Sequence, residues 1–333
     1  MTLTKTAVIR TAPRVPGPRR PVSSVAVTTI LLCVMFAAGS LRYPGFFSGQ
    51  VVLDIIVDNS FLVVLAVGMT FVVLTGGLDL SVGSVVGLTG VVASALLRAG
   101  WPPGVVIVVM IAVGMTVGLL VGLVIQYFEI EPFIATLVAM FLVRGLCYVL
   151  SPQAVAIHDG YFVAVAQTQI PIGLGLLISP GAIVSVLFVV MAALVLRFTR
   201  FGRTVYAVGG RRREAAVLMG LAANRTRVLV YVISGFSAGV AGVLFSFYTL
   251  SGDSGAGMGM ELDAIAAVVI GGTVLTGGRG YVLGSLLGVL VLGMISTLIS
   301  FDGTLSTWWA SIITGALLLT FVLLQRLLVV RAR

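Results

Sequence analysis

The chain has 333 residues, of which 59% are hydrophobic and 9% are charged, and its mean hydropathy is +1.19. Soluble domains carry about a quarter of charged residues, so this composition excludes an ordinary soluble fold. The net charge of +9 gathers at the ends of apolar segments. That pattern orients membrane helices, and we therefore expect no nucleic-acid partner.

The first 22 residues are polar, basic and rich in proline, and we predict a disordered cytoplasmic tail over 1–22. The apolar run that follows is similar to a secretory signal sequence, with FAAGS as a candidate cleavage site. An uncleaved first membrane span is the preferred interpretation, because nine more apolar segments follow it.

Ten apolar segments approach the length of about 20 residues that crosses a bilayer. They cover roughly 23–40, 61–75, 82–98, 104–126, 132–150, 173–197, 228–250, 262–276, 281–300 and 307–328. The prediction is an all-α polytopic membrane protein of about ten transmembrane helices, in a single membrane-spanning domain over 23–333. The mixed connections 41–60 and 151–172 should lie on the outer side, with room for short helices.

Arginine sets the predicted orientation. Basic residues concentrate in the tail, in the loop 197–227 and at the C-terminal end, and such segments stay on the cytoplasmic side. Ten spans satisfy this with both termini in the cytoplasm.

The sequence contains an internal repeat at an offset of 201 residues. VLTGG occurs at 73–77 and again at 274–278, and ten of the 22 positions from 66 to 87 match their counterparts. The segments 61–75 and 262–276 are short, and each is followed by a Gly-Gly pair. Short, glycine-interrupted segments at matching places in two halves of a transporter indicate its binding site. Whether the two copies run parallel or inverted stays open.

A carboxylate stands within the first of these glycine sites. Asp79 follows Gly76 and Gly77 and precedes Ser81 and Ser84. Glycine accepts positive φ and lets a helix break there, and a helix that restarts at either serine offers free N–H groups for Asp79 to cap. The alternative is a hydroxyl-binding or gating role, and the two interpretations are compatible.

The second half offers similar candidates. Gly277 and Gly278 form the second predicted break. Glu261 and Asp263 precede an apolar run, and Asn59 precedes another, so that capping is the default interpretation of all three and a place in the pathway the alternative.

Arg144 interrupts the fifth apolar segment. A charge at this depth needs a partner, so we expect it to pair with an acid or with backbone carbonyls. A position lining the pathway is the alternative.

Catalytic chemistry has little support. Lys5 is the only lysine, so the chain cannot hold the phosphate-binding loop of an ATPase. His158 is the only histidine, in a predicted outer loop, and Cys33 and Cys147 lie within apolar segments. We expect no catalytic residue, no cofactor and no metal site.

The loop 197–227 contains a short helical pattern over 214–221, flanked by glycines. Its small apolar face suits docking into a partner's groove, and contact with anionic lipid is the alternative. The candidate docking residues are Arg213, Glu214, Ala215, Ala216, Leu218 and Gly220.

Three motifs carry a resemblance that covers nearly the whole chain after the tail. GGLDLSVGS, RFGRTVYAVGGRRREAAVLMGL and ELDAIAAVVIGGTVLTGGRG resemble the signatures of bacterial sugar ABC-importer permeases of the ribose type. The stretch SFDGTLSTWWASI, with the first motif, looks most like a permease subunit of a galactofuranose importer.

The resemblance implies a permease domain in the bacterial inner membrane that pairs with a second permease or a copy of itself. It also implies a tandem-domain ATPase inside and an extracytoplasmic sugar-binding protein outside. The segment 214–221 would be the coupling helix. The charged run RRRE at 211–214 departs from the family's usual pattern and leaves the detailed fit to the ATPase open.

Two other classes compete with this interpretation. An ion- or proton-coupled secondary transporter would use Asp79, Glu261 or Asp263 as its carrier group. A channel or scaffold would need neither the repeat nor the arginine-rich loop.

Overall fold

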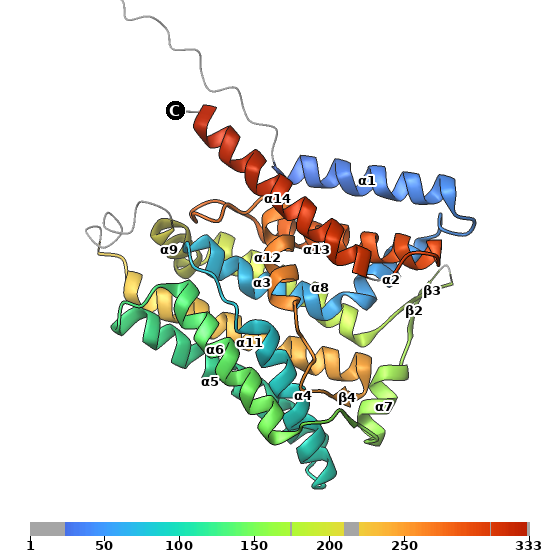
Figure 1. Cartoon of the computed structure of the whole chain (residues 1–333), viewed down its shortest axis with the longest axis horizontal. Helices are drawn as coiled ribbons and strands as arrows, with labels where there is room; N and C mark the ends of the chain where they lie inside the picture. Colours follow the sequence, from blue (N-terminus) through green and yellow to red (C-terminus); the bar gives the residue numbers. More distant parts are fainter. Residues whose placement is uncertain (1–23, 174, 210–219, 307, 332–333) are drawn as a thin grey trace, which may run out of the picture.

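The computed structural model describes residues 24–173, 175–209, 220–306 and 308–331. This part of the chain folds into thirteen helices and two small antiparallel sheets, so the all-α class is confirmed (Figure 1). The helices of the first half are α1 (Ser24–Arg42), α2 (Gly49–Asp58), α3 (Ser60–Leu74), α4 (Val82–Arg98), α5 (Pro103–Tyr127) and α6 (Pro132–Leu150). Those that follow are α7 (Gly160–Gln167), α8 (Pro180–Phe198), α9 (Arg200–Val208), α11 (Ala223–Thr249), α12 (Met260–Ile270), α13 (Val282–Asp302) and α14 (Trp308–Arg331).

Each of the ten predicted segments overlaps a helix, but ten complete spans are not confirmed. In the described part of the chain, six helices are long and apolar enough to cross a membrane, and a seventh is obtained if α2 and α3, bent by 61°, count as one. Helices α3 and α12 have 15 and 11 residues. A 15-residue helix is about 22 Å long, which is less than the ~30 Å thickness of the hydrocarbon core. Helices α3 and α12 are this short because each of them ends at a break.

Helix α3 forms the centre of the molecule. All its residues except Phe61 are buried, and the helix is apolar on every side, as expected of a helix surrounded by others. It packs against α8, α11, α12 and α13. Helices α1 and α14 lie on one side of this centre, and α5 and α6 on the other (Figure 1).

Close approach of α5 and α11 depends on glycine. A Cβ at Gly114 would lie 2.9 Å from the Gly239 nitrogen, and one at Gly118 would lie 3.0 Å from the Gly235 Cα. Small residues at four-residue spacing let the two backbones touch, as in other membrane helix pairs. This contact holds α11 in the position from which it meets α3.

Both predicted outer connections contain a short helix, as the sequence suggested. Ser48 caps α2 by accepting a hydrogen bond from the Val51 N–H, and Asp159 caps α7. Strand β1 (Val155–Ala156) pairs with β4 (Ser251–Gly252), and β2 (Ile170–Gly173) with β3 (Leu176–Ile178).

Candidate functional site

The first predicted break is present between α3 and α4. Gly76 adopts φ +82, a conformation that favours glycine, and its N–H still bonds to the Val73 carbonyl. At Gly77 a Cβ would press on the Tyr231 hydroxyl and lie 3.3 Å from Val72. Both glycines are therefore required here, one for its backbone angle and the other for lack of space.

Asp79 fastens this break to α11. The side chain is only 1% exposed. One carboxylate oxygen accepts hydrogen bonds from the Ser81 N–H at 3.0 Å and the Ser81 hydroxyl at 2.6 Å, and the other accepts one from the Ser234 hydroxyl at 2.7 Å. All three bonds lie within the break or join it to α11.

The predicted cap needs a correction in its details. Ser81 occupies the N-cap position of α4, and its side chain makes no cap bond. Asp79 stands two residues earlier and binds the backbone of the break, because the chain stays non-helical until Val82. Ser84 lies inside the helix, where its hydroxyl donates to the Ser81 carbonyl at 2.7 Å.

The second break begins earlier than predicted. Helix α12 ends at Ile270, and the chain stays non-helical until Val282. The helix ends in a glycine cap, because Gly272 adopts φ +92 and the N–H groups of Gly272 and Thr273 donate to the carbonyls of Val269 and Val268. Gly271 lies against the Gly284 backbone, where α12 and α13 cross. Gly277 and Gly278, with φ +80 and +75, form the far end of this break and not its start.

The two breaks are in direct contact. The Gly278 N–H donates to the Leu74 carbonyl at 2.8 Å, and a Cβ at Gly76 would lie 3.4 Å from the Thr276 carbonyl oxygen. The tertiary structure thus brings together the VLTGG motifs of the two repeat copies.

Arg144 supports a stretch of non-helical backbone instead. One of its guanidinium nitrogens donates to the carbonyls of Ser254 and Ala256, each at 2.6 Å. The stretch 251–259 runs along α4, and a Cβ at Gly87 would lie 2.8 Å from the Ala256 oxygen and 2.9 Å from Arg144. The predicted pairing with carbonyls is confirmed, while a pathway role stays a prediction.

None of the three other capping candidates makes the expected N-cap bond to its helix. Asn59 makes no cap bond to α3. It is also the C-cap residue of α2, and its amide donates back to the Ile55 carbonyl of that helix at 2.8 Å. Glu261 accepts from the Gly259 N–H at 3.2 Å, but its second carboxylate oxygen has no partner among the described residues. Asp263 lies one turn into α12, which has no side-chain cap.

The predicted site residues therefore fall into separate groups. Gly76, Gly77, Asp79, Gly277 and Gly278 gather where the breaks meet. Glu261 and Arg144 lie beside Gly83 and Gly87 of α4, and Asn59 lies apart, beside Gly293 of α13.

Sequence reasoning missed two contributors to the junction of the breaks. Ser234 holds Asp79, and the Tyr206 hydroxyl donates to the Gly280 carbonyl at 2.9 Å. Burial raises the pKa of the Tyr206 phenol, which stays protonated and able to donate. Ser234 carried a usable signal, since a serine inside an apolar helix needs a partner.

The docking candidates Arg213, Glu214, Ala215, Ala216 and Leu218 lie outside the described residues. Gly220 is described: it is exposed and adopts φ +72, a conformation that favours glycine.

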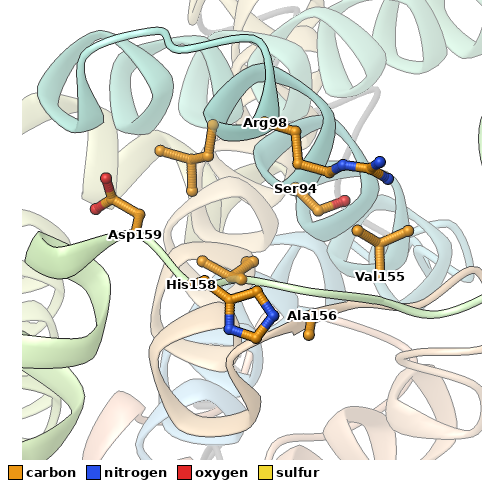
Figure 2. Close-up of a pocket in the computed structure, with 8 residues that line it drawn as sticks. Ser94, Arg98, Val155, Ala156, His158 and Asp159 are labelled. Carbon is orange, nitrogen blue, oxygen red and sulfur yellow. The ribbon is translucent and has the colours of Figure 1, made fainter.

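A surface pocket of about 520 Å³ lies between the end of α4, β1 and the start of α7. Figure 2 shows Arg98, His158 and Asp159 around it. His158 is exposed, as predicted for a loop residue. The pocket contains none of the predicted pathway residues, and the described chain holds no cluster of metal-ligand side chains.

Comparison with known proteins relates the sequence to a family of transport proteins. Residues 51–322 match a family described as the branched-chain amino acid transport system / permease component. The chain is 43% identical to the inner membrane ABC transporter permease protein YjfF of Escherichia coli, over 86% of each chain. It is 38% identical to the fructose import permease protein FruG of Bifidobacterium longum, over 92% of this chain and 90% of the relative.

A third relative is the ribose import permease protein RbsC of Escherichia coli, which is 36% identical over 89% of this chain and 92% of its own length. No solved structure matches the chain. The similarity to all three relatives runs through both breaks and α11.

Proposed function

The chain belongs to the branched-chain amino acid transport system / permease component family, and from this premise we propose that it is a membrane permease subunit of an ATP-driven sugar importer. The observation that carries the proposal is the similarity, over at least 80% of this chain, to permeases named for fructose and ribose import. The chain is then a multi-pass protein of the bacterial inner membrane and a non-catalytic transport subunit.

The substrate class we propose is a neutral monosaccharide, with galactofuranose as the first choice. The named relatives favour a sugar over the amino acid in the family's description. The likeness of SFDGTLSTWWASI to a galactofuranose permease subunit adds the finer assignment. A neutral polyol needs only weak hydroxyl contacts along its path, and charged side chains are few at the breaks.

Transport would proceed by alternating access between this chain and a second permease, either a copy or a homologue. A tandem-domain ATPase would dock at 213–220 on the cytoplasmic side, and a sugar-binding protein on the outer side. Closure of the ATPase would move the docking segment and rock the helices around the breaks. In this scheme Asp79 keeps the first break attached to α11 while the helices move.

Orientation follows from the same scheme. Both termini and the loop 197–227 lie in the cytoplasm, as the distribution of arginine favours, and α2 and α7 face outward. The membrane domain occupies 23–333.

Uptake by the reconstituted complex tests the proposal. Proteoliposomes that contain both permease subunits and the ATPase should take up radiolabelled monosaccharide under one condition only. ATP must be present on the side of the membrane where the ATPase is bound, and the binding protein on the opposite side. Orthovanadate should abolish this uptake, and a protonophore should leave it unchanged.

Two results would contradict the proposal. Uptake driven by an ion gradient without ATP would indicate a secondary transporter, and preferential uptake of leucine or valine would indicate an amino acid permease. Galactofuranose, ribose and fructose compared at equal concentration decide among the sugars.

A further inference from the structure

The described residues on the two sides of the segment 210–219 lie against each other. Val208 at the end of α9 and Ala223 at the start of α11 are each 4% exposed and pack together with Ala207 and Leu221. A loop closed at its base transmits displacement to the residues that anchor it. The contacts of the last residues of α9 therefore decide what the loop can move.

Gly209 anchors the loop directly on the two breaks. A Cβ at this position would lie 2.8 Å from the Gly278 Cα and would also press on the Leu74 carbonyl. Its backbone is extended, with φ −68 and ψ 150, so any residue could adopt the conformation. The absence of a side chain here is explained by the close contact and not by backbone geometry.

Two contacts from α9 reinforce this anchor. Tyr206 donates to the Gly280 carbonyl in the second break. Phe201 stacks on Phe71 in the last turn of α3, with ring centroids 6.3 Å apart. Helix α9 thus touches the chain on both sides of the Gly278–Leu74 hydrogen bond.

We propose that Gly209 and Tyr206 are positioning residues that transmit movement of the 209–222 loop to both breaks at once. The inference rests on the proposed function for what moves the loop. The three-way contact of Leu74, Gly209 and Gly278 joins one loop to the two repeat copies, so displacement of the loop changes both breaks together.

Hydrogen exchange of the purified permease in nanodiscs tests the junction itself. Gly209→Ala should accelerate exchange in peptides covering 74–81 and 274–280 by about fivefold or more, the range expected when a buried hydrogen bond is lost. Tyr206→Phe keeps the ring and should accelerate only the second peptide. Gly104→Ala, where an added Cβ meets nothing within 4 Å, is the matched control.

The complete complex supplies a second readout. If the junction transmits movement, both variants lower the number of sugars moved per ATP hydrolysed, whereas a merely structural defect lowers uptake and hydrolysis in proportion. Unchanged exchange in both variants, or an unchanged ratio, overturns the inference. A wild-type complex that moves no sugar with ATP contradicts the proposed function instead, and the exchange measurement still judges the junction.

Discussion

Asp79 holds the first break through three short hydrogen bonds in a site that is almost closed to solvent. Both carboxylate oxygens act as acceptors, so the site is built for two acceptor atoms. A longer hydrogen bond, from the Tyr231 hydroxyl of α11 to the Leu78 carbonyl at 3.5 Å, also joins the break to α11. A change of one atom in the Asp79 side chain therefore tests the role of this site.

Asp79→Asn replaces one acceptor oxygen with an amide that donates. At least one of the three donors then loses its partner, at a cost of about 1–3 kcal/mol. We expect sugar uptake to fall by roughly tenfold, the effect of about 1.4 kcal/mol on a rate, while the amount of protein in the membrane stays near the wild-type level.

Ser234→Ala provides the graded comparison, because it removes one donor and leaves the Ser81 bonds in place. Its uptake should lie between that of wild type and Asp79→Asn. Wild-type uptake by Asp79→Asn would exclude a pathway or gating role for the carboxylate.

At the scale of elements, the stretch 251–259 lies in a groove on α4 that glycine provides. Non-helical backbone at membrane depth persists only where its polar groups find partners, and here Arg144 supplies two of them. The Ser254 hydroxyl lies within hydrogen-bond distance of the Cys147 carbonyl of α6 and of the carbonyl of Ser151, which follows α6, and its one proton is shared between them. Helices α4 and α6 thus enclose the stretch between them.

Gly87→Ala should loosen this arrangement. The new Cβ would stand 2.8 Å from the Ala256 oxygen and 2.9 Å from Arg144, and overpacking of this kind costs about 1–3 kcal/mol. We expect a lower midpoint of thermal unfolding in detergent.

Gly145→Ala is the matched control, since its Cβ on α6 would meet nothing within 4 Å. Alanine is favoured over glycine in a helix, so this variant should melt at or above the wild-type temperature. Equal midpoints for the two variants would show that the groove is not tightly packed.

At the scale of the whole molecule, orientation in the membrane is the property to measure. Cysteine labelling in spheroplasts with a membrane-impermeant maleimide distinguishes the two sides. In a Cys33→Ser background, His158→Cys should label in intact spheroplasts and Arg203→Cys only after permeabilisation. Both positions are exposed, and the remaining Cys147 is buried. The reverse pattern would invert the predicted topology.

The sequence was sufficient for the class of fold and the positions of the apolar helices. Apolar runs of nearly 20 residues have one stable solution in a bilayer, because backbone groups there must bond within their own segment. The repeat and its Gly-Gly sites also followed from the chain alone, since glycine adopts without steric cost the positive φ found at Gly76, Gly277 and Gly278.

The tertiary structure decided which groups meet. The crossing of α12 and α13 at Gly271 and Gly284 is a contact between positions that share no local pattern. The same is true of Ser234 beside Asp79, Arg144 beneath 254–256 and Gly209 against both breaks. Hydropathy and glycine spacing describe each segment by itself, whereas these contacts arise only when distant segments pack, and packing is therefore what converts two separate breaks into one site.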